Sequence, residues 1–168
     1  MEAVILIHGI TGSALSQQQG SDLVSIWPPD TSDLFGYSQA KFDILLDKAL
    51  TVMGIIDTAM DGCVQVYAPI EADLQDICTN HLNAEYDLFC YDWRQNAFTS
   101  TSQLAARLGA IGSKEPISSI TLIFHSQGGQ IARLMLESGA YSGSMAPWFA
   151  KIKRALFICT PQWERPRR

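Results

Sequence analysis

Short apolar runs alternate with amphipathic segments along most of the chain, and this alternation predicts its secondary structure. Five runs have the length and residue types of buried strands: residues 3–8, 63–67, 86–92, 119–124 and 154–159. Four segments between them repeat apolar residues at helical spacing: residues 39–53, 69–82, 101–111 and 127–138. Strands that alternate with helices form a parallel sheet whose two faces are covered. The pattern therefore predicts an α/β fold, with a mostly parallel sheet and helices on both faces.

One segment breaks this alternation. Residues 14–37 show no clear period and contain the run Trp27-Pro28-Pro29-Asp30. We expect a surface excursion over the ligand site rather than a separate domain. Three of its apolar residues are candidates for substrate contact, and a simple packed loop is the alternative. These residues are Ile26, Trp27 and Phe35.

A single serine stands between a strand and a helix in the run Phe124-His125-Ser126-Gln127-Gly128. A sharp strand-to-helix turn of this kind lifts a serine hydroxyl above the sheet and aims the free amides of the helix at a reacting carbonyl group. Small residues are typical on both sides of such a turn, and Gly128 meets this demand while Phe124 does not. Ser126 is therefore predicted to be a nucleophile, and a simple helix N-cap is the alternative.

The chain opens with a strand-like run that ends in the loop His8-Gly9-Ile10-Thr11-Gly12. Backbone N–H groups of a glycine-containing loop can hold the negative charge that develops on a carbonyl oxygen during acyl transfer. Taken alone, the same residues are typical of an ordinary exit from a strand into a loop. Their position ahead of a serine turn favours the first interpretation.

A third motif, Tyr91-Asp92-Trp93-Arg94, ends a strand-like run about thirty residues before the serine. Together with the first loop, the serine turn and Cys159-Thr160-Pro161-Gln162-Trp163, it resembles the lecithin:cholesterol acyltransferase branch of the α/β-hydrolases and its bacterial lipase and esterase relatives. The resemblance makes residues 1–163 a partial α/β-hydrolase core, incomplete at its C-terminal side, with residues 14–37 as a cap-like excursion. Residues 164–168 are left as an unstructured basic tail.

This resemblance implies a serine esterase, lipase or O-acyltransferase that acts on carboxylic esters, lipid esters included, through an acyl-serine intermediate. It makes Ser126 the nucleophile. The backbone N–H group of Ile10 or Thr11 and that of Gln127 would form the oxyanion hole. No cofactor is implied.

The residues that normally activate such a serine are missing downstream. In α/β-hydrolases an acid and then a histidine follow the nucleophile, but the only acids after Ser126 are Glu137 and Glu164, and no histidine follows. Glu137 lies on the next helix at about 16 Å, given a rise of ~1.5 Å per residue, and Glu164 lies in the tail. We therefore expect a truncated or frame-shifted product of a longer esterase. The alternatives are a non-catalytic binding or scaffold protein and a minimal esterase assisted by His8.

Other residues of the motifs are expected to have structural roles. His125 neighbours Ser126, so its side chain should leave the strand end on the opposite side. Asp92 and Arg94 should share one strand face and form an ion pair or a hydrogen-bonded clamp near the top of the sheet. Trp93 is expected in the core, with a substrate contact as the alternative.

Composition and charge narrow the class of protein. With 47% apolar and 17% charged residues, the 168-residue chain is typical of one compact, soluble domain. The net charge of −5 argues against nucleic-acid binding and against attraction to anionic lipid headgroups. The apolar runs are too short for a transmembrane segment, and the first strand starts at once without a signal peptide, so a cytoplasmic location is expected.

The four cysteines have no metal-binding spacing, so no metal site is predicted. They are Cys63, Cys78, Cys90 and Cys159. Cys90 and Cys159 lie in strand-like runs and are expected to be buried free thiols. The strand that ends near Thr160 should lie close to an unpaired sheet edge, which favours self-association. The partner expected from the resemblance is a small-molecule or lipid ester substrate.

Overall fold

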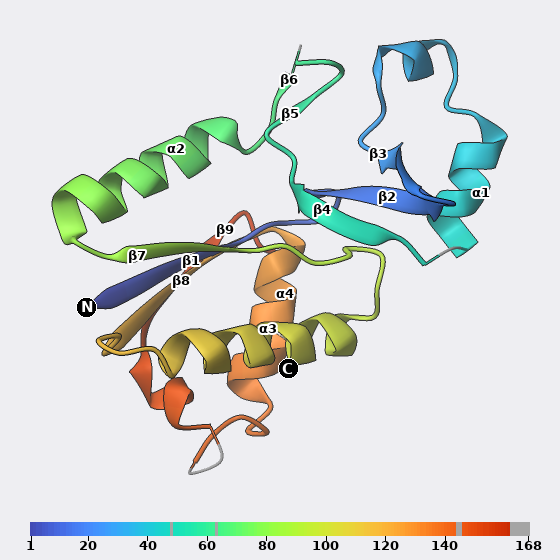
Figure 1. Cartoon of the computed structure of the whole chain (residues 1–168). Helices are drawn as coiled ribbons and strands as arrows, with labels where there is room; N and C mark the ends of the chain where they lie inside the picture. Colours follow the sequence, from blue (N-terminus) through green and yellow to red (C-terminus); the bar gives the residue numbers. More distant parts are fainter. Residues whose placement is uncertain (48, 63, 144–145, 162–168) are drawn as a thin grey trace, which may run out of the picture.

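The computed structural model describes residues 1–47, 49–62, 64–143 and 146–161. Its centre is a parallel sheet with the strand order β7-β1-β8-β9 (Figure 1). The strands are β1 (Glu2–Ile7), β7 (Glu85–Phe89), β8 (Ser119–His125) and β9 (Ile152–Ile158). The prediction of an α/β fold built on a parallel sheet is confirmed. The ends of these four strands differ from the predicted ones by at most three residues.

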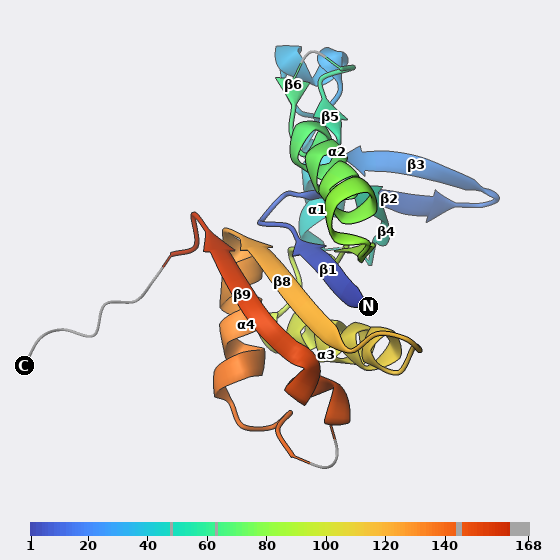
Figure 2. The same ribbon diagram turned by 90° about the vertical axis from the view of Figure 1, so that its left-hand side faces the viewer.

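Helices cover both faces of this sheet, as predicted (Figure 1, Figure 2). Helices α3 (Ala97–Gly112) and α4 (Gln127–Glu137) lie on one face, and α2 (Ala68–Asp76) lies on the other. The cause is the alternation of side chains along β1, because Ile5 and Ile7 join the apolar cluster of α3 and α4 whereas Leu6 joins that of α2. All three side chains are fully buried, as expected for a central parallel strand.

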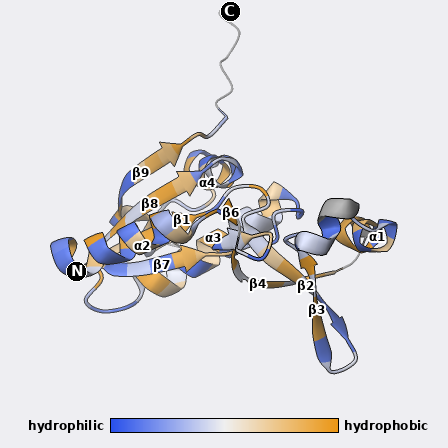
Figure 3. Ribbon diagram, turned by 90° about the horizontal axis from the view of Figure 1, so that it is seen from above, coloured by the Kyte–Doolittle hydropathy of each residue, from blue (hydrophilic) through white to orange (hydrophobic). Residues whose placement is uncertain are grey.

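A second, antiparallel sheet lies beside the first and was missed by the sequence analysis. It has the order β3-β2-β4 and consists of β2 (Ser13–Gln19), β3 (Asp22–Trp27) and β4 (Thr51–Ile55). The β2–β3 hairpin projects from the rest of the molecule (Figure 2, Figure 3). The aperiodic excursion expected over residues 14–37 is therefore largely a hairpin. Its strands escaped detection because residues 17–22 are all polar or glycine, so no alternation marks them.

Two other predicted elements need correction. The helix expected over 39–53 ends at Asp47 as α1 (Gln39–Asp47), because the β-branched residues after it pair with β2 instead. The strand expected over 63–67 is reduced to β6 (Val64–Gln65), which pairs with β5 (Thr58–Ala59) and not with the central sheet. Position 63 itself lies outside the described residues.

The predicted helix over 69–82 is confirmed as two consecutive pieces. Helix α2 is followed directly by the π-helical segment η2 (Ile77–Leu82), which ends at Asn83 in the left-handed conformation. Pro69 lies in the first turn of α2, where its missing N–H group costs nothing. Two short 3₁₀ helices complete the described elements, η1 (Thr31–Phe35) and η3 (Pro147–Lys151).

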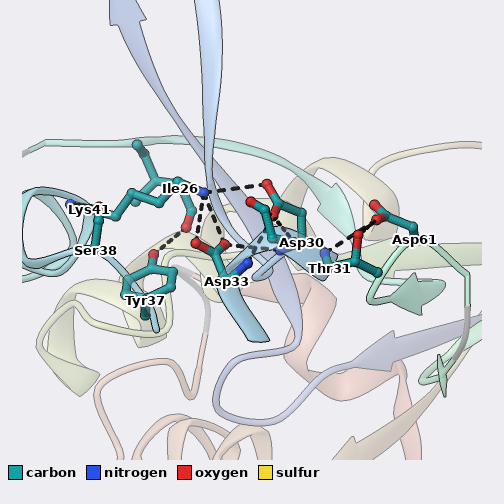
Figure 4. A network of polar contacts seen from close by, with 9 residues as sticks. Ile26, Asp30, Thr31, Asp33, Tyr37, Ser38, Lys41 and Asp61 are labelled. Carbon is teal, nitrogen blue, oxygen red and sulfur yellow. Dashed lines mark hydrogen bonds and ion pairs between the residues drawn. The ribbon is translucent and has the colours of Figure 1, made fainter. Parts of the chain in front are cut away.

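A network of polar side chains joins η1, α1 and the loop after β5, and the Tyr37 hydroxyl donates to the Ile26 carbonyl of the hairpin (Figure 4). Lys41 of α1 lies with its Nζ atom 2.9 Å from Asp33 Oδ2 and 3.4 Å from Asp30 Oδ2. Asp30 caps η1 by accepting hydrogen bonds from two backbone N–H groups of its first turn. The Thr31 N–H group donates to Asp61 Oδ2 at 3.2 Å, which adds the loop after β5. The network explains how a segment without a core of its own keeps a defined position.

Strand β9 lies at the edge of the central sheet, and its far end is apolar and exposed. Its residues Leu156, Phe157 and Ile158 are each more than a third exposed. An exposed apolar edge strand is a template for pairing with another chain, so self-association through this edge stays a prediction. Among the described residues, none of the helices combines the length and the apolar character that a membrane span requires.

Candidate functional site

Ser126 forms the turn between β8 and α4, as the sequence predicts. Its φ is 51° and its ψ is −119°, a conformation that residues with a Cβ atom rarely adopt. The Ser126 N–H group donates to the carbonyl of Ile158 at 3.0 Å, and its carbonyl accepts from the Gly129 N–H group at 3.0 Å. The side chain makes no capping hydrogen bond to α4. Ser126 therefore starts the helix without acting as a side-chain N-cap.

The first loop passes directly beside this serine. Because β1 pairs with β8 up to Ile7 and Phe124, Gly9 comes next to Ser126 at the carboxyl ends of the strands. A Cβ atom added at Gly9 would lie only 2.8 Å from Ser126 Cβ and 3.3 Å from the carbonyl oxygen of His125. Only glycine fits this close approach. The structure thus brings Ser126 and the first loop together.

Three backbone N–H groups around Ser126 are left without a hydrogen-bond acceptor in the described part of the chain, those of Ile10, Thr11 and Gln127. Ile10 and Thr11 form the middle of a turn closed by the Gly12 N–H group, which donates to the Gly9 carbonyl at 3.2 Å, and Thr11 has a φ of 61°. Gln127 is the first residue of α4, where helical N–H groups have no partner within the helix. These are the three residues that the resemblance named as oxyanion donors.

Side chains hold these backbone segments in place. The Trp27 indole N–H group donates to the Thr11 carbonyl at 3.0 Å. The side-chain amide of Gln127 donates from Nε2 to the Trp93 carbonyl at 3.2 Å, and its Oε1 atom accepts from the Tyr91 hydroxyl at 3.2 Å. These bonds hold the backbone around the Ile10, Thr11 and Gln127 N–H groups in one conformation.

His8 is fully buried, and backbone groups engage both of its ring nitrogens. Nδ1 donates to the Gly9 carbonyl at 2.7 Å, and Nε2 accepts from the Tyr91 N–H group at 3.2 Å. The ring stacks on Tyr91 with centroids 4.3 Å apart. Burial lowers the pKa of His8 to about 4, although the bond to Gly9 opposes the shift. His8 is thus a neutral structural group with no nitrogen available to Ser126.

His125 lies against Tyr67 of the opposite layer. Its Nδ1 atom is 2.6 Å from the Tyr67 hydroxyl, which also accepts the Gly9 N–H group at 2.9 Å. No hydrogen bond joins the Ser126 hydroxyl to any residue in the described ranges, His125 included. We expected the His125 side chain to leave the strand end on the side opposite Ser126. Its ring also lies beside Gly9, because Nδ1 would be 3.1 Å from a Cβ atom built there.

Tyr67 was not identified as a site residue from the sequence. The pattern predicts it as the last residue of a strand, yet it immediately precedes α2 and is buried. The available signal was its position directly before Ala68-Pro69, because a chain that turns into a helix at that point places a strand-end side chain over the sheet. Nothing local in the sequence reveals that its hydroxyl meets two segments far away along the chain.

Asp92 and Arg94 form the predicted clamp, but in a turn beyond the strand rather than on one strand face. Arg94 Nε lies 2.8 Å from Asp92 Oδ1, and Nη2 lies 2.6 Å from Oδ2. Arg94 Nη1 also donates to the Leu45 carbonyl at 2.6 Å, which ties α1 to this turn. Burial raises the pKa of Asp92, but the hydrogen bonds from Arg94 and Gln95 outweigh it and hold the pKa below its usual value. The pair is architectural.

Trp27 and Trp93, two of the candidates for substrate contact, donate hydrogen bonds to backbone carbonyls of the first loop and of β2, and a substrate contact by either residue stays a prediction. Trp93 donates its indole N–H group to the Ser13 carbonyl at 3.2 Å and packs edge-to-face on Trp27, with ring centroids 5.5 Å apart. Ile26 is buried and takes no part in a surface site. The side chain of Phe35 lies outside the described part of the structure.

A cleft of about 330 Å³ opens beside the serine turn. Its walls come from the first loop, the start of α2 and the ends of β8 and β9, and they include Ile10, Tyr67, Ile70, His125 and Ile158. A larger cleft of about 520 Å³ lies between the start of α3, the outer side of α4 and Pro161. The smaller cleft is the relevant one, because its lining includes His125 next to the serine and the two loop residues with unpaired amides.

Among the described residues, Tyr67 and His125 are the titratable side chains that line this cleft. Glu137 forms an ion pair with Arg133 along α4, and Glu164 lies outside the described ranges. No group of three metal-ligating side chains gathers within the described residues. Among the cysteines that the structure describes, Cys78 is buried, Cys90 is half-buried, and Cys159 is exposed just past the end of β9, so the expectation of a buried Cys159 is wrong.

The structure combines an α/β fold with a strand-serine-helix turn that lies beside a strand-loop turn, whose N–H groups at Ile10 and Thr11 have no acceptor among the described residues. No protein-family model matches the sequence, and no curated protein is significantly similar to it. The resemblance to α/β-hydrolases therefore rests on the motifs and on the geometry around Ser126.

Proposed function

We propose that this chain carries the nucleophile and the oxyanion hole of a serine esterase, lipase or O-acyltransferase acting on carboxylic esters. The observation that carries the proposal is Ser126 itself, held at a φ of 51° between β8 and α4. It lies next to a loop whose N–H groups at Ile10 and Thr11 are unpaired among the described residues. A simple N-cap would bond its own helix, and Ser126 does not.

In this mechanism the Ser126 Oγ atom bonds to the carbonyl carbon of the ester. The oxyanion that forms accepts hydrogen bonds from the Gln127 N–H group and from the Ile10 or Thr11 N–H group. The bond from the carbonyl carbon to the alcohol oxygen then breaks, and the alcohol leaves with a proton. Water or a second alcohol takes the acyl group from Ser126, which regains its proton.

The adjacent cleft favours an ester with an apolar group. Three of its lining side chains, Ile10, Val66 and Ile158, are exposed apolar residues, and Ile70 beside them packs on the apolar cluster of α2. Exposed apolar side chains that gather at a concave site are typical of surfaces that bind an apolar ligand. An aliphatic acyl chain attached to the reacting carbonyl would bury this surface.

The second candidate is a non-catalytic binding protein with the same architecture, and one observation favours it. A serine hydroxyl is a poor nucleophile without a base, and both nitrogens of His8 are engaged by the backbone. A minimal esterase assisted by His8 is therefore not proposed. The catalytic proposal requires a proton acceptor from outside the described residues.

Labelling with an alkyl fluorophosphonate, measured by intact mass, tests the proposal in the presence and absence of imidazole as an external base. We expect one adduct on the wild-type protein, formed faster with imidazole, and none on Ser126→Ala. Ser138→Ala is the matched control, because Ser138 is an exposed serine at the other end of the same helix and should label like the wild type. A wild type that stays unlabelled with imidazole would favour the binding protein.

A further inference from the structure

We infer that Tyr67 is a positioning residue of this site, whose hydroxyl group fixes the first loop and the nucleophile strand relative to each other. The inference rests on the proposed function, since it assigns a role in presenting Ser126 to the oxyanion donors. It concerns a residue that no sequence motif singled out.

The geometry places one hydroxyl between two segments that carry the reacting groups. Tyr67 belongs to the layer of α2, with its ring buried at 7% exposure. Its oxygen accepts the Gly9 N–H group at 2.9 Å and lies 2.6 Å from His125 Nδ1. Gly9 immediately precedes the amides of Ile10 and Thr11, and His125 immediately precedes Ser126.

The Gly9 N–H group can only donate, so the Tyr67 oxygen accepts from it. The proposed link uses the single phenolic hydrogen as the donor to His125 Nδ1, 2.6 Å away, and this arrangement requires the ring proton of His125 to lie on Nε2. Burial raises the pKa of Tyr67, with the Gly9 bond opposing the shift, so the phenol keeps this hydrogen at neutral pH.

The link matters because β1 and β8 separate beyond Ile7 and Phe124, their last paired residues. The segment after β1 enters a loop whose N–H groups at Ile10 and Thr11 have no acceptor among the described residues. The segment after β8 enters α4. A donor shifted by about 1 Å loses much of its value for catalysis, since hydrogen bonds and reacting atoms must align. Tyr67 spans the two chains at the point where sheet pairing ends, and it also lines the cleft beside Ser126.

The experiment compares Tyr67→Phe with Tyr86→Phe in the full chain. Tyr86 packs against the same apolar cluster, and its buried hydroxyl has no partner among the described residues, so its removal controls for loss of a phenolic oxygen in this layer. The first readout is the rate of fluorophosphonate labelling with imidazole. We expect a roughly tenfold loss for Tyr67→Phe and the wild-type rate for Tyr86→Phe.

The second readout is spectroscopic and does not depend on labelling. In ¹⁵N NMR spectra of the wild type, His125 should show the tautomer with the proton on Nε2, and Tyr67→Phe should shift it toward a mixture, because Nδ1 loses its donor. Tyr86→Phe should leave the spectrum unchanged.

The outcomes separate the two proposals. A wild type that is never labelled overturns the proposed function, and the link itself then stands or falls on the His125 spectrum. An unchanged His125 spectrum in Tyr67→Phe overturns the link. A changed spectrum with equal labelling rates in the two variants overturns the positioning role while leaving the proposed function intact.

Discussion

The ends of β1 and β8 carry the same order of residue types, yet they form two different halves of the site. At the end of each strand, an apolar residue is followed by a histidine and a small residue. The series are Ile7-His8-Gly9 for β1 and Phe124-His125-Ser126 for β8. The strands are neighbours and parallel, so these positions lie side by side. His8 is fully buried with both nitrogens on the backbone, whereas His125 is half-buried and meets a side-chain hydroxyl.

The difference comes from the path of the backbone after each histidine. After β1 the chain turns through Gly9 into a loop with unpaired N–H groups, while after β8 it turns through Ser126 directly into α4. Gly9 leaves the space that the Ser126 side chain occupies. One strand end therefore contributes room and hydrogen-bond donors, and the other contributes the hydroxyl. Two similar local sequences thus have complementary roles because the backbone follows different paths after β1 and after β8.

The largest expected effect concerns the buried histidine. The pKa of His8 is lowered from 6.5 to about 4, so between these pH values the unfolded chain binds more protons than the folded one. The free energy of unfolding should therefore decrease by about 3 kcal/mol as the pH falls from 6.5 to about 4.

Urea unfolding at several pH values measures this decrease in the free energy of unfolding. His8→Gln should lose this part of the pH dependence and the exposed-site control His81→Gln should keep it; parallel curves for wild type and His8→Gln would contradict the assignment.

A smaller effect is expected where α4 crosses the end of β1. A Cβ atom at Gly128 would lie 2.6 Å from the His8 carbonyl oxygen and 2.8 Å from that of Ile7, and backbone atoms cannot give way easily. Gly128→Ala should therefore destabilise the fold by about 1–3 kcal/mol. Gly109→Ala in α3 is the matched control, because its Cβ would meet Trp148 at 3.5 Å and should be neutral or stabilising. The midpoints of thermal unfolding of the two variants measure this difference in stability. Equal midpoints would show that the packing of α4 on β1 leaves room for a methyl group at Gly128.

The smallest effect has the opposite sign. Ser126→Gly should be more stable than Ser126→Ala by about 1 kcal/mol, because both variants lose the hydroxyl and only glycine adopts a φ of 51° without strain. Chemical denaturation of the two variants measures the difference. If Ser126→Ala proves equally stable, the turn stores no strain and its conformation is not imposed by the surrounding packing.

The parts of this site that depend on local order could be predicted from the sequence. The turn at Ser126 results from an apolar strand, a serine and a glycine in succession. The N–H groups of Ile10 and Thr11 have no acceptor among the described residues because β1 ends at Ile7 and the chain then leaves the sheet. The parallel sheet results from alternation with helices. The two local features are each encoded within about ten residues of chain, whereas the sheet is encoded in the alternation along the whole chain.

Features that depend on distant partners could not be predicted in this way. The role of Tyr67 arises from two contacts 58 residues away in each direction, and nothing beside it in the chain encodes them. The β2–β3 hairpin lacks alternation because its strand ends are polar, and its strands are defined by their pairing with each other and with β4. The hydrogen bonds from the indole N–H groups of Trp27 and Trp93 to the backbone of the first loop and β2 also join separate segments, and a ligand contact by either residue stays a prediction.

The glycine doublet at the start of α4 joins segments that are remote in sequence. Gly128 faces the carbonyl oxygens at the end of β1, while Gly129 faces Thr160, whose Oγ1 atom would lie 2.2 Å from a Cβ built there. The first turn of α4 thus follows β8 directly and packs between the ends of β1 and β9. A side chain at either position would collide with a different neighbouring segment. In a set of related sequences, these two positions should therefore vary less than the buried leucines and isoleucines of the sheet.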